Sequence, residues 1–295
     1  MAIKNLLIIL IFILYFGCAN NEKQMPKLNT IKDDLYKTII IDKIPQKVIS
    51  LSPNLTELLF ELGQGNKIIG NTSYCNYPDS AKLIENVANL LTVNLEKIKA
   101  LNPDLIFITT EGNSKTDYEK LSKLGLKVFV SNPRNYNGIK KTLLDMGKIF
   151  KSSEKVNSIV DSWDTRLNIV KKNHDKIVFK TAIFFVSTSP IFSIGKNSFI
   201  HQILTFSGLE NISANSEISY HMYKSEEIIK KNPDYILLYE NNTNDVNELV
   251  ETYPEWNTLS AVVNNRVLFL STDLFRRPGS RFVEAVEKLN MLITK

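Results

Sequence analysis

The residue types that carry most enzyme chemistry are few in this chain and widely spaced. Its three histidines, His174, His201 and His221, are far apart, and its only cysteines are Cys18 and Cys75. They cannot form a closed zinc site of closely spaced cysteine and histidine ligands from sequence neighbours. The Gly-x-Ser-x-Gly motif of serine hydrolases and a complete glycine-rich phosphate loop are also missing. These absences argue against an enzyme.

Cys18 is the one residue whose setting predicts a specific modification. A basic start and the apolar run Leu6–Phe16 are typical of an export signal, and the run is shorter than the about 20 residues that span a bilayer. The run ends in Tyr-Phe-Gly before the cysteine, which resembles a bacterial lipoprotein signal. We expect a signal peptide over residues 1–17, palmitate or another lipid on Cys18, and a tether over residues 18–33. The alternative is an ordinary signal peptide with a chance cysteine.

Composition and charge argue against a disordered, a membrane-embedded or a nucleic-acid-binding protein. The chain has 43% hydrophobic and 23% charged residues, which is typical of a globular protein. Its formal net charge of +5 is spread evenly, so no basic block indicates nucleic-acid binding.

A long amphipathic helix is predicted in the middle of the chain. Its apolar positions follow the spacing of one helix face and are Val156, Ile159, Val160, Trp163, Leu167 and Val170. Residues 151–175 contain neither glycine nor proline, so we expect a rigid connecting helix. It separates an N-terminal lobe over residues 34–150 from a C-terminal lobe over residues 176–295.

Both flanking segments alternate short β-like runs with helical runs. This alternation favours an α/β fold with two Rossmann-like lobes, and a parallel sheet covered on both faces in the first. Leu35–Ile41 is predicted to be a strand. Asn54, followed three residues later by Glu57, is predicted to cap the next helix in a near capping box.

An internal repeat supports two similar lobes. Residues 96–107 match residues 226–237, and each segment runs from an acidic start through a short helix and Asn-Pro-Asp into a buried strand. The proline ends the helix and directs the chain into the sheet. The alternative is that this unit is common in α/β proteins.

Several stretches resemble one known family. Residues 48–53 with Thr56 and Glu57, 102–106, 195–200, 208–212 and 256–262 are similar to the substrate-binding proteins of ABC importers for ferric siderophores, haem and vitamin B12. The similarity spans about residues 34–295 and is greatest to the members that bind vitamin B12. It implies two α/β lobes joined by one long helix, with a ligand cleft between the lobes.

The resemblance also implies a set of ligand-binding residues. They are Tyr74, Tyr77, Phe192, Tyr220, Asp273, Phe275 and Arg277, with Leu90 in the place of a cleft tryptophan and His221 as a further cleft candidate. Aromatic rings would cover the apolar face of a corrinoid while polar groups fix its amide edge. Alternatively, Tyr74 and Tyr77 pack a turn, and Asp273 and Arg277 form a surface ion pair.

Glu96 and Glu226 occupy matching positions of the repeat. In the family, one acidic residue on each lobe pairs with arginines of the membrane permease. A glutamate in the first turn of a helix also suits the helix dipole, so a purely local role is the alternative.

The sequence therefore predicts a lipid-anchored, monomeric binding protein on the extracytoplasmic face of a bacterial membrane. It would carry a corrinoid to an ABC permease with a cytoplasmic ATPase, without a resident cofactor or metal. Haem or a ferric siderophore is the alternative ligand. An α/β enzyme and a surface adhesin are the alternatives from other classes.

Overall fold

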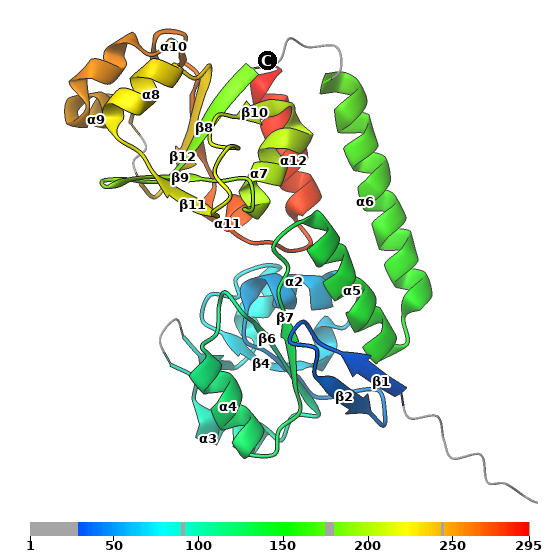
Figure 1. Cartoon of the computed structure of the whole chain (residues 1–295). Helices are drawn as coiled ribbons and strands as arrows, with labels where there is room; N and C mark the ends of the chain where they lie inside the picture. The colour runs from blue at the N-terminus through cyan, green and yellow to red at the C-terminus, as the bar shows by residue number, and fades with distance from the viewer. Residues whose placement is uncertain (1–28, 90–91, 175–179, 243–244, 295) are drawn as a thin grey trace, which may run out of the picture.

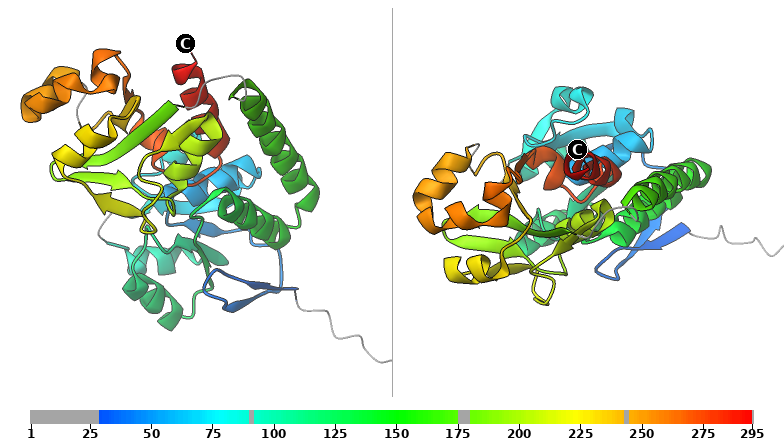
Figure 2. Two further views of the ribbon diagram at one scale, coloured as in Figure 1. Left: turned by 45° about the horizontal axis from the view of Figure 1, so that its top comes forward. Right: turned by 90° about the horizontal axis from the view of Figure 1, so that it is seen from above.

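The computed structural model describes residues 29–89, 92–174, 180–242 and 245–294. The expected signal peptide, Cys18, most of the expected tether and Leu90 lie outside these residues. The chain forms two α/β lobes, with one long helix along one side of both (Figure 1). Figure 2 shows the same arrangement from two other directions.

The N-terminal lobe is built on a five-stranded parallel sheet of order β5-β4-β3-β6-β7. Its strands are β3 (Val48–Ser50), β4 (Ile68–Thr72), β5 (Asn86–Ala88), β6 (Leu105–Thr109) and β7 (Val128–Ser131). Its helices are α2 (Pro53–Glu61), η1 (Gly65–Lys67), η2 (Asp79–Leu83), α3 (Leu95–Leu101), α4 (Lys115–Lys123) and α5 (Tyr136–Phe150). The expected parallel sheet is therefore present in this lobe.

A hairpin precedes this sheet and corrects two predictions. Strand β1 (Asn29–Lys32) lies within the expected tether, and β2 (Thr38–Ile41) begins three residues later than the predicted strand. The Asp33 carboxylate accepts hydrogen bonds from the amides of Leu35 and Lys37, which forces a turn there. Buried isoleucines in both strands attach the hairpin to the core.

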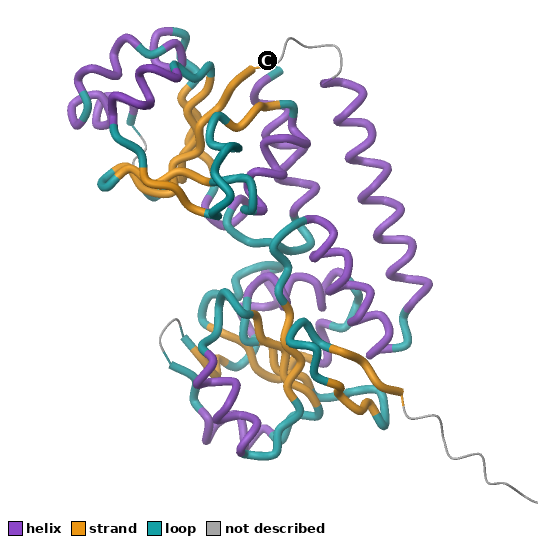
Figure 3. Tube along the Cα trace, viewed as in Figure 1, coloured by secondary structure: helices purple, strands orange, loops and turns teal. Residues whose placement is uncertain are grey.

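Helix α6 (Ser153–His174) confirms the predicted long helix. Val156, Ile159, Trp163, Leu167 and Val170 are buried, as the apolar spacing predicted. The helix packs against α5 of the first lobe and α7 and α12 of the second, and it is uninterrupted (Figure 3). Among the described residues, no helix has both the length and the apolar character needed to cross a membrane.

The C-terminal lobe contains a mixed sheet of order β11-β9-β8-β12-β13, with β10 also paired to β8. Its strands are β8 (Lys180–Thr188), β9 (Ile191–Ile194), β10 (Leu209–Asn211), β11 (Tyr220–Met222), β12 (Tyr235–Tyr239) and β13 (Val267–Leu270). Its helices are α7 (Phe199–Ser207), α8 (Ser225–Lys231), α9 (Val246–Thr252), η3 (Pro254–Thr258), α10 (Ser260–Val263), α11 (Thr272–Phe275) and α12 (Phe282–Ile293). Strand β9 runs antiparallel to both β8 and β11.

The repeated Asn-Pro-Asp segment has the same structure in both lobes. Asn102 and Asn232 end α3 and α8 in the left-handed conformation, with φ of 49° and 41°. Asp104 then accepts hydrogen bonds from the amides that precede β3, at 2.8 and 3.0 Å. Asp234 accepts from the amide and hydroxyl of Thr181 in β8, at 2.9 and 3.0 Å. Each aspartate thus connects the incoming strand to its neighbour in the sheet.

The two lobes also share an apolar core. The ring of Tyr136, at the start of α5, stacks on Phe282 of α12 at 5.2 Å and meets the edge of Phe206 at 6.0 Å. The Tyr136 amide donates to the side-chain oxygen of Gln202 in α7. One group of buried apolar side chains therefore runs through both lobes and along α6.

The start of α2 meets the C-terminal lobe at Gly279. The predicted capping box is wrong, because α2 begins at Pro53 with Ser52 in the cap position, and its cap side chain makes no hydrogen bond to the helix backbone. Asn54 instead donates to the carbonyl of Pro278 at 3.1 Å. A Cβ atom at Gly279 would lie 3.1 Å from the Cβ of Asn54, so only glycine allows this close approach without movement.

The hydrogen bonds to Asp104 predict a pH-dependent contribution to stability. The amides of Gln46 and Lys47 and the Lys43 ammonium hold the pKa of Asp104 below its ordinary 3.8, although burial opposes them. We expect Asp104→Asn to lower the free energy of unfolding near pH 7 by about 1–2 kcal/mol. Because a lowered pKa stabilises the fold only above that pKa, the difference should shrink as the pH falls below 3.8.

Urea denaturation of the parent and Asp104→Asn across this pH range measures the effect. Asp161→Asn, which alters an exposed carboxylate on α6, is the control and should change little. A stability difference that stays constant at the lowest pH would rule out the ionised carboxylate as its source.

The contact between Gly279 and Asn54 predicts a cost for a single added methyl group. Gly279→Ala should reduce the free energy of unfolding by about 1–3 kcal/mol, because the backbone of α2 cannot move aside freely. Thermal unfolding measures this loss. Ser280→Ala, one residue further along, is the control. Equal melting temperatures for both variants would contradict the close approach of the lobes at this point.

Candidate functional site

Loops of both lobes meet at the carboxyl ends of the N-terminal strands. Loops after β3, β4, β6 and β7 reach this edge, where ligands commonly bind in open parallel sheets. Strand β11 and helix α11 lie on the side of the C-terminal lobe that faces α2 (Figure 1). In addition to the bond from the Tyr136 amide to Gln202, hydrogen bonds join the lobes here, between residues 54–76 of one lobe and 273–281 of the other.

A buried ion-pair cluster joins the lobes at this edge, and we call Glu57, Arg277 and Arg281 the inter-lobe clasp. The Glu57 side chain is 1% exposed and the two arginine side chains 13%. Arg281 donates from Nε and Nη2 to the two carboxylate oxygens of Glu57, at 3.0 and 2.8 Å. Burial acts to lower the pKa of Arg281, but the carboxylate outweighs it and the pKa rises.

Arg277 connects the clasp to the loop that follows β4. Its Nη1 donates to Glu57 Oε1 at 3.0 Å and to Asn76 Oδ1 at 2.7 Å. Its Nη2 donates to the Tyr74 carbonyl at 3.1 Å and to Asp273 Oδ1 at 2.8 Å. All four N–H groups on Nη1 and Nη2 therefore have acceptors within the protein.

The loop after β4 presents two aromatic rings beside the clasp. Tyr74 and Tyr77 are both about half exposed. The Arg281 guanidinium lies 4.2 Å from the centre of the Tyr77 ring. Asn76, between the tyrosines, donates to Asp273 Oδ2 at 2.5 Å. The loop is thus attached to the C-terminal lobe by Asn76, which bonds to Asp273, and by Tyr77, whose ring packs on Arg281.

Cys75 attaches the same loop to the core of the N-terminal lobe. Its thiol is buried and lies 3.2 Å from the Thr56 hydroxyl and 3.3 Å from the Thr72 hydroxyl. Thr56 also donates to the Ser50 hydroxyl at 2.8 Å. These buried polar groups satisfy one another under the exposed tyrosines.

The antiparallel strands β9 and β11 form an aromatic wall on the C-terminal lobe, which we call the β9–β11 wall. Met222 pairs with Phe192, and Tyr220 with Ile194, so these side chains share one face of the two strands. Tyr220 and Met222 are 54% and 59% exposed. This face offers apolar surface to a ligand.

Charged groups of both lobes lie near the Tyr220 hydroxyl. Burial and then Glu111 raise the pKa of Tyr220, whereas Arg276 and Arg134 act to lower it. Glu111 and Arg134 belong to the N-terminal lobe and are 3.7 Å apart. Arg276 packs over the Tyr239 ring at 6.0 Å. The β9–β11 wall therefore faces the first lobe across a mixed set of charges.

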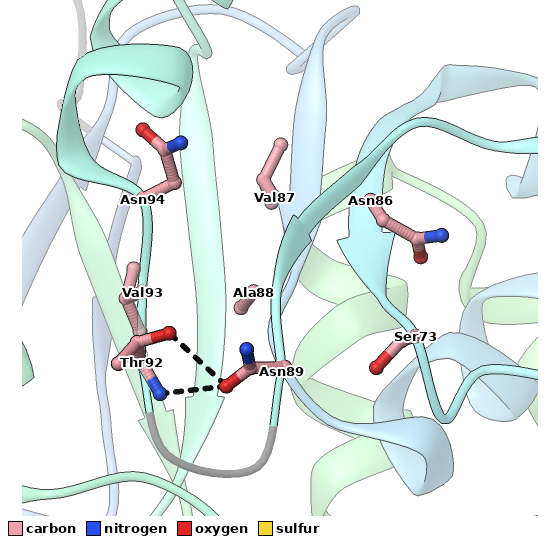
Figure 4. A pocket seen from close by; sticks show the side chains of 8 residues that line it. All are labelled: Ser73, Asn86, Val87, Ala88, Asn89, Thr92, Val93 and Asn94. Atoms are coloured by element: carbon pink, nitrogen blue, oxygen red, sulfur yellow. Dashed lines mark hydrogen bonds between the residues drawn. The ribbon is translucent and has the colours of Figure 1, made fainter.

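A separate groove of about 450 Å³ runs along β5 within the N-terminal lobe. Three asparagines lie beside apolar side chains in its lining (Figure 4), which consists of Ser73, Asn86, Val87, Ala88, Asn89, Thr92, Val93 and Asn94. Within this groove the Asn89 side-chain oxygen accepts two hydrogen bonds, from the amide and the hydroxyl of Thr92. The groove borders the loop that carries Tyr74 but lies on one lobe alone.

The structure brings together some of the residues that the sequence singled out. Tyr74, Tyr77, Asp273 and Arg277 form one cluster, and the Asp273–Arg277 pair matches the ion-pair alternative. Tyr220 and Phe192 lie on the β9–β11 wall, and Arg276, which follows Phe275 and precedes Arg277 in the chain, acts to lower the pKa of Tyr220.

Two predicted residues do not join this group. Phe275 is 1% exposed and packs in the core, where it cannot touch a ligand. His221 lies on the opposite face of β11 from Tyr220, with its ring 4.6 Å from Tyr223. Within the described residues, no group of histidine, cysteine and carboxylate side chains could hold a metal ion.

Sequence reasoning missed Arg281 and the partners of Glu57. The segment Arg277-Pro278-Gly279-Ser280-Arg281 places two guanidiniums four residues apart around a tight loop, which is a usable signal. Nothing in the sequence indicates their partner, because Glu57 is 224 residues from Arg281.

Glu96 and Glu226 lie in the first turns of α3 and α8, one in each lobe. Both side chains are exposed, and neither has an intramolecular partner among the described residues. Their neighbours are engaged, since Lys97 pairs with Glu85 and Glu227 accepts from the Lys224 amide.

Comparison with known proteins gives a consistent family. The chain matches the periplasmic binding protein family over residues 48–274. It is 27% identical over 246 residues to the vitamin B12-binding protein of Vibrio campbellii, covering 83% of this chain and 88% of that protein. It is 29% identical over 299 residues to an uncharacterised ABC transporter substrate-binding lipoprotein of Bacillus subtilis, covering 96% and 93%.

Solved structures share the fold. The periplasmic vitamin B12-binding protein of Vibrio cholerae has a TM-score of 0.71 and 27% identity, and the match covers 85% of this chain and 97% of that one. A possible iron-binding periplasmic protein of Staphylococcus epidermidis has a TM-score of 0.78 and 24% identity, covering 86% and 100%.

The family match spans most of the chain, and the likeness to a solved periplasmic binding protein agrees with the two-lobed fold. These relatives are solute-binding proteins rather than enzymes. The chain therefore belongs to the periplasmic binding protein family.

Proposed function

We propose that this protein binds a corrinoid between its lobes and delivers it to the permease of an ABC importer. The observation that carries the proposal is the pairing of two aromatic surfaces, one on each lobe, beside a polar cluster. Tyr74 and Tyr77 belong to the first lobe, and Tyr220 and Phe192 to the second. The similarity to vitamin B12-binding proteins supports the same ligand class.

The chemistry of a corrinoid suits these surfaces. Its macrocycle is broad and apolar, and amide groups surround its edge. Aromatic rings bury such a face with little conformational entropy cost, while hydroxyl and amide groups bind the edge. The phenol groups of Tyr74 and Tyr220 and the side chains of Asn76 and Asp273 supply donors and acceptors of this kind.

The connection between the lobes favours binding with little domain movement. Helix α6 packs on both lobes, and the clasp ties them again at the ligand edge. Hinge closure would require breaking buried ion pairs and separating Tyr136 from Phe282. We therefore expect ligand binding to leave the orientation of the two lobes nearly unchanged.

The lipid anchor is part of the same proposal. Cys18 follows an apolar run with the pattern of a lipoprotein signal, and the residues up to β1 would form a tether. The related protein of Bacillus subtilis is named a lipoprotein. A lipid on Cys18 would keep the binding protein close to its permease. We propose that the protein acts there as a monomer.

Arg276 supports a second candidate ligand, an anionic iron chelate such as a ferric siderophore or haem. Its side chain is exposed, and it has no carboxylate partner among the residues that the structure describes. Arg134 on the facing lobe lies close enough to influence the same tyrosine. A pair of guanidiniums on two lobes suits a ligand with carboxylate groups.

Glu96 and Glu226 are proposed to dock on the permease. They are exposed, they occupy matching helices of the two lobes, and they have no partners within the described residues. A permease with two-fold symmetry would recognise one such carboxylate on each lobe.

Absorbance titration of the purified full-length protein with cobalamin, cobinamide, haem and a ferric hydroxamate tests the ligand. We expect sub-micromolar affinity for a corrinoid, and Tyr220→Ala should weaken it by about tenfold through lost ring contact. Tyr36→Asn is the matched control, because Tyr36 is an exposed tyrosine on the β1–β2 turn and asparagine tolerates its φ of 60°. Binding of haem or siderophore alone would replace the corrinoid by the second candidate.

The docking proposal predicts a separation of uptake from affinity. Glu96→Lys combined with Glu226→Lys should leave corrinoid affinity within about twofold of the parent and lower uptake by about tenfold, because the reversed charges repel permease arginines. Glu119→Lys with Glu251→Lys changes one exposed carboxylate on each lobe and serves as the control. Unchanged uptake in the first pair would refute docking through these residues.

A further inference from the structure

Glu57 occupies a position that its local helix does not explain. It lies in the middle of α2 rather than in its cap, and its carboxylate is almost fully buried. A buried carboxylate without compensation is very unfavourable, because it loses its hydration. Within the described residues its compensation comes from across the lobe boundary, where Arg277 and Arg281 donate hydrogen bonds to its carboxylate.

The two arginines perform different tasks. Arg281 binds Glu57 through two hydrogen bonds and also donates to the Asp273 carbonyl at 3.2 Å, so it fixes the position of the second lobe against α2. Arg277 uses one hydrogen bond on Glu57 and three others on Asn76, Tyr74 and Asp273. It therefore fixes the loop that carries the exposed tyrosines.

The charge of Glu57 keeps these two guanidiniums together. Without it, two cations that are each 13% exposed would remain in one buried cluster, and Asp273 would balance Arg277 alone. Mutual repulsion would then move one of them toward solvent. Movement of Arg277 would release the Tyr74 carbonyl and the Asn76 side chain, while movement of Arg281 would separate the lobes.

We propose that Glu57 is the positioning residue of the ligand site. Its buried carboxylate holds Arg277 and Arg281 so that the Tyr74–Tyr77 loop and the β9–β11 wall stand at a fixed separation. Glu57 does not touch the ligand and acts through the two arginines. The effect on ligand affinity rests on the proposed function, whereas the effect on the loop and the lobes does not.

Glu57→Gln separates charge from shape, because glutamine keeps the size and one acceptor oxygen. We expect corrinoid affinity to fall by about tenfold, mainly through faster dissociation, since fewer molecules hold the competent arrangement. Glu57→Gln combined with Arg281→Gln removes the repulsion and should bind more tightly than Glu57→Gln alone. Stopped-flow absorbance gives both rate constants.

Cys75 provides a second readout that needs no ligand. In the full-length chain with Cys18→Ser it is the only thiol, and it is buried in the loop that Arg277 holds. Glu57→Gln should increase the rate of maleimide labelling of Cys75 by about tenfold, because the Tyr74–Tyr77 loop opens more often when Arg277 no longer holds it. The double variant should again fall between Glu57→Gln and the parent.

Glu287→Gln is the matched control. It removes one carboxylate from the Arg166–Glu287 pair between α6 and α12, where the side chains are 39% and 38% exposed. Its affinity and labelling rate should stay within about twofold of the parent. Equal behaviour of Glu57→Gln and Glu287→Gln, or a double variant as impaired as the sum of its single changes, would overturn the proposal. A parent that binds no corrinoid would refute only the proposed ligand, and Cys75 labelling would still decide the role of Glu57.

Discussion

The buried carboxylate of Glu57 has lost its hydration and therefore needs cationic partners, and this requirement determines how the two lobes meet. Glu57 can satisfy it only when residues 277–281 of the second lobe lie against α2 of the first. That contact brings the loop after β4 opposite α11, and it forces the backbone at Gly279 close to Asn54. The proposed ligand edge is therefore built around a buried ion-pair cluster between the lobes, with α6 as a second connection.

The same small unit constructs the two halves that meet there. In each lobe a short helix ends at a left-handed asparagine, and an aspartate then connects the next strand to its neighbour. This geometry brings Glu96 and Glu226 to the first turns of equivalent helices. The lobes differ in what surrounds the unit, because antiparallel strands β9 and β11 carry the aromatic side chains of the second lobe, whereas a loop carries the exposed tyrosines of the first.

Local patterns predicted the parts of the fold that depend on neighbouring residues. The apolar spacing of α6, the repeat and the α/β alternation are of this kind. Glu57 illustrates what they could not predict: its spacing from Asn54 suggested a helix cap, whereas its true partners are 220 and 224 residues away. Likewise, Phe275 and His221 are next in sequence to other predicted ligand residues, but Phe275 packs in the core and His221 lies on the opposite face of β11 from Tyr220. Proximity along the chain does not determine the direction of a side chain.

The burial of Cys75 protects its thiol from oxidation in an extracytoplasmic compartment. An accessible unpaired thiol in an oxidising compartment forms mixed disulfides, links molecules into covalent dimers and proceeds to sulfenic and sulfinic acids. Enclosure between the hydroxyls of Thr56 and Thr72 keeps the sulfur away from oxidants and from a second molecule. The loop can therefore carry a cysteine at its base without the protection of a disulfide partner.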